Sequence, residues 1–208
     1  MKKGYEVTYE WVIKLLQNCD FDESSRRLGL KQVAQNSVLI DFLERTYIIA
    51  KDGIELAEQK IAWTPKTEGY DYNLKSVLGY YLLSEANLEP GNDFCLLTHF
   101  SGGVFGNGNA WPDSLGKVYG NDYKKFCRIA EKLGMVFETE KRAGQYVWSY
   151  TLLPKIPIKI MYYEGDDEYP TTLQILYDKT AIQFYKFEPL AVLHICFIEG
   201  LAAIGKQE

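Results

Sequence analysis

The sequence predicts an α+β fold, in which antiparallel sheet or sheets built from hairpins pack against about four to five helices. Three observations support this class. Several segments repeat apolar residues at helical spacing, and other short segments are rich in β-branched and aromatic residues and are joined by tight turns. The two kinds of segment do not alternate as in a parallel βαβ fold. We expect one domain over residues 1–208, because no linker, repeat or low-complexity tract divides the chain.

The N-terminal part is expected to hold two helices and a small meander. Residues 5–18 place apolar side chains at helical spacing, so an amphipathic helix opens the chain. Asp22 can cap a short second helix that ends before Gly29. A Lys-Asp-Gly turn at residues 51–53 joins the last two of the predicted strands. These strands are expected at residues 38–42, 47–50 and 54–61.

The middle of the chain predicts two more helices and a second group of strands. Asp71 begins a helix with one apolar face. Asn121 or Asp122 caps the next helix, which Gly134 closes. Pro157 suits the start of a strand or an edge strand. Strands are expected at residues 94–100, 135–139, 146–152, 158–163 and 173–177.

The C-terminal helix is apolar nearly all round, so we expect it to be buried in the core. It starts at Glu188-Pro189, because proline is favoured at the first helical position. Asp178 can cap a short helical turn before it. The longest apolar run, residues 190–198, is far shorter than the roughly 20 residues needed to cross a bilayer. We therefore expect no membrane partner.

Composition and charge indicate a cytoplasmic protein that does not bind nucleic acid. The net charge is −5 and the pI is about 5.2, without the clustered lysines and arginines of a nucleic-acid surface. The N-terminus lacks the apolar core of a signal peptide. The 4 cysteines are widely spread without a Cys-x-x-Cys pair, so we favour buried thiols and see no evident cofactor. The expected partner is a small molecule or a protein.

An acidic segment at residues 163–170, Tyr-Glu-Gly-Asp-Asp-Glu-Tyr-Pro, follows a predicted strand. If the strand continued, Glu164, Asp166 and Glu168 would lie on one side and Asp167 on the other. Such carboxylates can hold Mg²⁺ or Ca²⁺, although their spacing does not match an EF-hand loop. Gly165 indicates a bend, and a solvated acidic turn is the preferred interpretation. Metal or ligand binding and acid–base catalysis stay as alternatives.

A glycine-rich segment, residues 101–109, follows another predicted strand. Backbone N–H groups in such a loop can bind anions, so Ser101, Gly102 and Gly103 are candidate ligand contacts. The segment matches neither the dinucleotide fingerprint nor the Walker A pattern. A surface loop is therefore the preferred interpretation, and a loop over a ligand pocket is the alternative.

Histidine and cysteine supply little for a metal or nucleophilic site. Of the 2 histidines, His99 lies on a predicted strand and His194 on the apolar C-terminal helix, where a core role is expected. A zinc site would be hard to build from so few ligands. The 16 tyrosines are more simply explained by packing than by stacking on a planar ligand.

Four motifs of the C-terminal third occur in a fixed order: residues 153–157 (Leu-Pro-Lys-Ile-Pro), the acidic segment, residues 175–181 (Ile-Leu-Tyr-Asp-Lys-Thr-Ala) and residues 188–193 (Glu-Pro-Leu-Ala-Val-Leu). This series resembles an uncharacterised prokaryotic family, number 3786 among the domains of unknown function. The family pattern has tryptophan and phenylalanine where this chain has Tyr163 and Tyr177. Some relatives look to be joined to an iron–sulfur domain like that of corrinoid iron–sulfur proteins. The resemblance therefore implies a link to anaerobic corrinoid or one-carbon metabolism, and no known activity. This chain lacks the cysteine motif for such a cluster.

The leading hypothesis is a cytoplasmic, non-catalytic ligand-binding or accessory domain. Its binding surface would combine polar segments at strand ends. The candidate contacts are Glu164, Asp166, Asp167, Glu168, Asp178, Ser101, Gly102 and Gly103.

Two other hypotheses remain open. The first is a divalent-metal, carboxylate-dependent enzyme of the hydrolase kind, with Glu164, Asp166 and Glu168 as metal ligands and Asp178 as a base. The second is a protein-interaction module that uses exposed aromatic surface.

Overall fold

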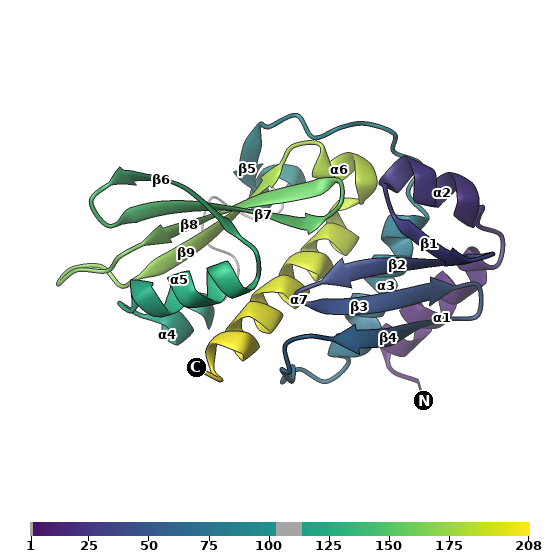
Figure 1. The fold of residues 1–208 in the computed structure, drawn as a ribbon, viewed down its shortest axis with the longest axis horizontal. Helices are drawn as coiled ribbons and strands as arrows, with labels where there is room; N and C mark the ends of the chain where they lie inside the picture. The colour runs from purple at the N-terminus through teal and green to yellow at the C-terminus, as the bar shows by residue number, and fades with distance from the viewer. Residues whose placement is uncertain (1, 103–113) are drawn as a thin grey trace.

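The computed structural model describes residues 2–102 and 114–208 (Figure 1). These residues form two antiparallel sheets, seven α-helices and one 3₁₀-helix, which confirms the α+β class. The helices are α1 (Gly4–Leu16), α2 (Phe21–Leu28), α3 (Tyr70–Leu82), α4 (Ser114–Tyr119), α5 (Tyr123–Lys132), α6 (Ala181–Phe184), α7 (Phe187–Gly205) and the 3₁₀-helix η1 (Leu97–Ser101). The strands are β1 (Lys31–Ala34), β2 (Ser37–Phe42), β3 (Arg45–Ala50), β4 (Gly53–Gln59), β5 (Phe94–Leu96), β6 (Val136–Arg142), β7 (Gln145–Leu153), β8 (Ile156–Tyr163) and β9 (Thr172–Asp178).

The first sheet is a meander in the order β1-β2-β3-β4, with α1 and α3 behind it in Figure 1. On β3, Arg45, Tyr47 and Ile49 are buried and alternate with partly exposed residues, as expected for a strand with one face in the core. β2 and β3 are joined by a two-residue turn at Leu43 and Glu44, whose φ angles are 48° and 59°. Both angles are positive, a conformation that hairpin turns usually build from asparagine and glycine.

The second sheet has the order β5-β9-β8-β7-β6. Its inner face packs against helices: Tyr150 stacks on Phe197 of α7, and Trp148 and Tyr162 contact Phe126 of α5. The acidic segment is the hairpin loop between β8 and β9, as the sequence predicts. The opposite face of the second sheet is open and carries a hollow.

Helix α7 runs between the two sheets (Figure 1). It contacts α3 on one side and α4 and α5 on the other. By length and composition alone its 19 residues could cross a membrane, yet 56% of its apolar window is buried inside the protein. That packing is the one expected of a core helix, and it confirms the prediction of a buried C-terminal helix.

Several sequence predictions were wrong in detail. Residues 94–100 are not one strand, because β5 ends at Leu96 and η1 follows, so His99 lies on a 3₁₀-helix. Asp20, not Asp22, caps α2 by accepting a hydrogen bond from the backbone N–H of Glu23. Pro157 lies at the start of β8, as predicted, but β8 is the central strand of its sheet. Strand β1 and helix α4 were not predicted.

The buried histidine of α7 makes the fold sensitive to acid. His194 is 5% exposed and its Nδ1 lies 3.1 Å from the Tyr177 hydroxyl. Burial lowers the pKa of His194 to about 4, below the ordinary value of about 6.5. Between these two values the unfolded chain binds a proton that the folded chain does not, so stability falls as the pH falls.

We expect the wild type to lose roughly 2 kcal/mol of unfolding free energy between pH 7 and pH 5 relative to the variant His194→Gln. Urea unfolding of both proteins at the two pH values measures this difference, and the variant corrects for the carboxylates that titrate in the same range. An equal loss in both proteins would show that His194 takes up its proton in the folded state.

Candidate functional site

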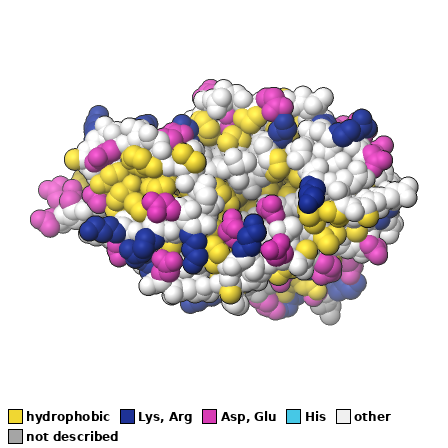
Figure 2. All heavy atoms as spheres, in the orientation of Figure 1, with side chains coloured by type: hydrophobic (Ala, Val, Ile, Leu, Met, Phe, Trp, Pro, Cys, Tyr) yellow, Lys and Arg dark blue, Asp and Glu magenta, His cyan; other side chains and the backbone are white. Residues whose placement is uncertain are grey.

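The acidic segment, residues 163–170, forms a turn that projects from one end of the molecule, at the tip of the β8–β9 hairpin (Figures 1 and 2). We refer to it as the acidic turn. Inside the turn, Oδ1 of Asp166 accepts hydrogen bonds from the backbone N–H groups of Glu168 and Tyr169, at 2.9 and 2.8 Å. These bonds lower the pKa of Asp166. Asp167 and Glu168 are exposed. The Asp166 carboxylate therefore holds the shape of its own loop.

Buried contacts attach this turn to the segment between α4 and α5. Thr171 is 4% exposed, contacts Asn121 through its hydroxyl, and accepts a hydrogen bond from the N–H of Gly165 at 3.1 Å. A Cβ at Gly165 would lie 2.5 Å from the Thr171 nitrogen, so only glycine fits. Packing and hydrogen bonding therefore account for Gly165 and Asp166 of the Glu-Gly-Asp motif.

The carboxylates predicted as metal ligands do not converge. Among the described residues, no group of three or more histidine, cysteine, aspartate or glutamate side chains is arranged to hold a metal ion. Glu164, Asp166 and Glu168 fall within this search. The geometry thus gives the metal-dependent enzyme hypothesis no site in the part of the chain that the structure describes.

Asp178 does not join the acidic turn, because it lies at the opposite end of β9, roughly 20 Å away at the usual rise per residue. Its carboxylate is fully buried, and Oδ1 accepts hydrogen bonds from Gly91 and from the N–H and hydroxyl of Thr180. Desolvation raises the pKa of Asp178, but these hydrogen bonds outweigh it and the net shift is downward. Asp178 ties the segment before β5 to the end of β9.

The glycine-rich segment is described only at its start. The hydroxyl of Ser101 donates to the carbonyl of Thr98 at 2.7 Å, and Gly102 ends η1 with a φ of 61°. Gly103 and the rest of the segment lie outside the described residues. A ligand role for Ser101, Gly102 and Gly103 stays a prediction.

A structural role for the acidic turn predicts that Thr171→Val lowers the unfolding free energy by about 1–3 kcal/mol, since a buried N–H loses its acceptor. The matched changes Asp167→Asn and Glu168→Gln should stay within about 0.5 kcal/mol of the wild type, because both side chains are exposed. Urea unfolding of the three variants measures these effects. If the two surface changes were as costly as the threonine change, the turn would owe its shape to its charges.

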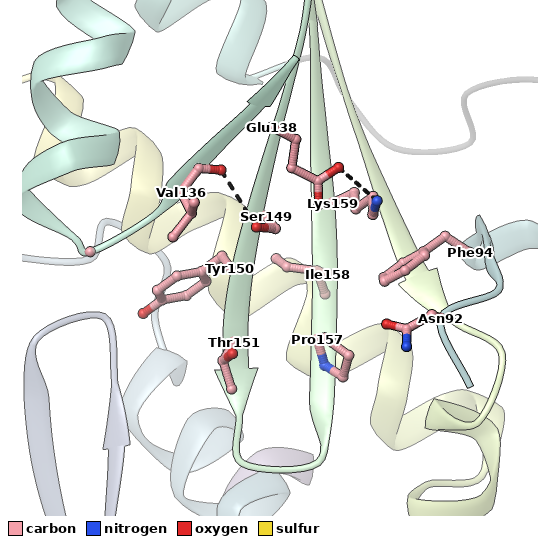
Figure 3. Close-up of a pocket in the computed structure, with 11 residues that line it drawn as sticks. Asn92, Phe94, Val136, Glu138, Ser149, Tyr150, Thr151, Pro157, Ile158 and Lys159 are labelled. Atoms are coloured by element: carbon pink, nitrogen blue, oxygen red, sulfur yellow. Dashed lines mark hydrogen bonds and ion pairs between the residues drawn. The ribbon is translucent and has the colours of Figure 1, made fainter. Parts of the chain in front are cut away.

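A hollow of about 400 Å³ lies on the open face of the second sheet (Figure 3). Its two charged side chains bind each other, since Lys159 pairs with Glu138 at 2.7 Å, and the hydroxyl of Ser149 donates to the carbonyl of Val136. The ammonium of Lys159 also lies 4.8 Å from the centre of the Phe94 ring. This hollow therefore presents no charged group that still needs a partner.

A second hollow, of about 430 Å³, differs in this respect. It lies between β3, β4, the segment at residues 62–65 and the first turns of α3. The lining includes Arg45, Tyr47, Trp63, Asp71, Lys75 and Gln207.

Arg45 is the unusual member of this lining. It is 5% exposed, and its guanidinium carbon lies 3.5 Å from the centre of the Trp63 ring. The guanidinium donates a hydrogen bond to the carbonyl of Trp63, but its Nε is buried without a partner. No carboxylate of the described residues lies within 4.0 Å of it. The carboxylate of Glu199 on α7 likewise keeps one buried oxygen unpaired, so the two charges do not satisfy each other.

Strained backbone and close packing hold Arg45 in this position. The turn at Leu43 and Glu44 delivers it to the start of β3. The indole N–H of Trp63 donates to the carbonyl of Leu43 at 3.3 Å. The Leu43 side chain lies against α7 where a Cβ at Gly200 would come within 2.4 Å of it, so glycine is needed there. Non-glycine residues with positive φ persist only where their surroundings over-determine them, and such strain concentrates at functional sites.

Tyr47 also lines this hollow and adds a phenolic hydroxyl to it. Burial raises the pKa of Tyr47, Arg45 lowers it and Asp71 raises it further, with a net upward shift. The hydroxyl therefore stays protonated near neutral pH and can donate a hydrogen bond to a bound ligand.

The predicted site residues do not include Arg45 or Trp63, although one signal was present. Arg45 is in phase with Tyr47 and Ile49, so strand alternation places it on the buried face. The predicted strand began at residue 47 and left the arginine in the turn. Trp63 lies in an irregular segment, where periodicity gives no such signal.

A protein-family model matches residues 20–199, and its description is Domain of unknown function (DUF3786). The match includes the acidic turn, Arg45 and Trp63. No curated protein and no solved structure matches the chain.

Proposed function

We propose that this chain, which belongs to the family described as Domain of unknown function (DUF3786), is a non-catalytic domain that binds a small carboxylate-bearing ligand at Arg45. Arg45 carries the proposal, because it is a buried cation that lines a hollow and has no anionic partner among the described residues.

The energetics of burial support a ligand at this position. An unpaired charge loses its hydration on folding, and its effective cost is several kcal/mol unless an opposite charge replaces the water. Stacking on Trp63 recovers about 2 kcal/mol at a desolvated site. An incoming anion can supply the opposite charge that the guanidinium lacks among the described residues.

A carboxylate suits the chemistry of the group. A guanidinium presents donors in a planar fork that matches the two oxygens of a carboxylate, and such pairs are frequently bidentate. The Trp63 ring fixes the plane of this fork before the ligand arrives. Little conformational entropy is then lost on binding, which favours affinity.

The proposed setting comes from the family resemblance. Relatives that look joined to an iron–sulfur domain like that of corrinoid iron–sulfur proteins suggest an accessory role in cytoplasmic corrinoid or one-carbon metabolism. The hollow supplies binding groups to this role: a cation in Arg45 and a protonated hydroxyl in Tyr47.

The variant Arg45→Met tests the proposal, because a site arginine and a structural arginine respond in opposite ways. We expect the variant to melt no lower than the wild type without ligand, since an unpaired buried charge is replaced by an apolar side chain. A carboxylate present at 100 times its Kd should raise the wild-type Tm by roughly 5–10 °C and leave that of the variant unchanged. Thermal melting against a panel of small carboxylates and inorganic phosphate provides the measurement.

Arg142→Met, at an exposed position on β6, serves as the matched control and should keep the ligand response of the wild type. If Arg45→Met lowered the Tm by several degrees and no carboxylate raised that of the wild type, Arg45 would be a structural residue and the proposal would be wrong.

A further inference from the structure

The hollow at Arg45 contains a balanced set of charges. Its charged lining residues are Arg45, Lys75, Glu55 and Asp71, two cations and two anions. Lys75 and Glu55 pair with each other at 3.5 Å. Arg45 and Asp71 are left over, one cation and one anion, and neither belongs to an ion pair within the described part of the chain.

Asp71 also lines the hollow, but it is exposed whereas Arg45 is buried. Asp71 belongs to the first turn of α3, directly after Tyr70. Arg45, Asp71 and Tyr47 all line this hollow, and both charges act electrostatically on the Tyr47 hydroxyl. A ligand seated on Tyr47 would therefore meet a cation and an anion.

Resting on the proposed function, we infer that the ligand is an α-amino acid, whose carboxylate pairs with Arg45 and whose ammonium pairs with Asp71. The two leftover charges match the two charges of such a zwitterion. A hollow of about 430 Å³ also leaves room for a side chain beside the charged groups. Leu56, Ala62 and Pro65 give that side chain an apolar wall.

The same charge inventory disfavours a phosphate group. A dianion would meet a single unpaired cation, because Lys75 is engaged with Glu55. It would also approach the Asp71 carboxylate, and like charges repel at short range. A plain carboxylic acid would satisfy Arg45 but leave Asp71 without a partner.

Calorimetric titration tests the inference with sets of matched compounds. The common L-amino acids are titrated into the full chain. Each carries the α-ammonium and the α-carboxylate that the two charges require. The carboxylic acid and the amine that correspond to the best binder follow. We expect the amino acid to bind at least tenfold more tightly than its des-amino acid. Asp71→Asn should reduce that ratio to near one, while Asp167→Asn, at an exposed position of the acidic turn, should preserve it.

The outcomes separate this inference from the proposed function. If the des-amino acid binds the wild type as tightly as the amino acid, or if Asp71→Asn keeps the ratio, the zwitterion inference is overturned while the carboxylate site at Arg45 stands. If no amino acid and no carboxylic acid binds the wild type, both the inference and the proposed function are overturned. If Asp71→Asn has the Tm of the wild type, its loss of preference for the amino acid over the des-amino acid reflects recognition and not unfolding of α3.

Discussion

Helix α7 is the constraint on which the rest of this fold depends. It is apolar on nearly every side, so the two halves of the chain must enclose it. Buried tyrosines from both halves attach to its backbone: the hydroxyl of Tyr70 donates to the carbonyl of Cys196, and that of Tyr119 donates to the carbonyl of Leu201, each at 2.9 Å. Because these hydroxyls are paired, the aromatic rings can be buried without an unsatisfied polar group. The helix thereby fixes α3 and α4 relative to each other.

The position of Arg45 follows from the same helix. Leu43 packs against α7 at Gly200 and accepts a hydrogen bond from the Trp63 indole through its carbonyl. These contacts hold Leu43 and Glu44 at positive φ angles, a conformation that neither residue type favours. A larger residue at 200 would displace Leu43 and, through the turn, the guanidinium two residues later. Packing against α7 therefore fixes the strained turn, and with it the position of Arg45 in the hollow.

The sequence predicts those parts of the fold that local chemistry determines. Gly29 and Asp122 end and begin helices because left-handed backbone and side-chain capping are local effects. Residues 94–100 misled the prediction, because a short apolar run does not distinguish a strand from a 3₁₀-helix. Strand β1 is only 4 residues long (Lys-Gln-Val-Ala), so it offers no run of β-branched and aromatic residues to recognise. The hollow is less predictable still, since tertiary packing alone brings Arg45 and Asp71 into the lining of one hollow.

The most conspicuous sequence motif and the most suggestive site are thus different parts of the molecule, and energetics explains why. In the acidic turn the N–H groups of Gly165, Glu168 and Tyr169 bind Thr171 and Asp166, so the motif stabilises the fold that contains it. At Arg45 an unpaired charge and two residues with positive φ each cost about 1–3 kcal/mol or more, against a total stability of about 5–15 kcal/mol for a typical protein. Stacking on Trp63 and the hydrogen bond to its carbonyl offset only part of these costs, which is the basis for proposing a ligand at Arg45. Under the proposed function, binding returns part of that cost, because a ligand selective for the folded state stabilises it by RT ln(1 + [L]/Kd).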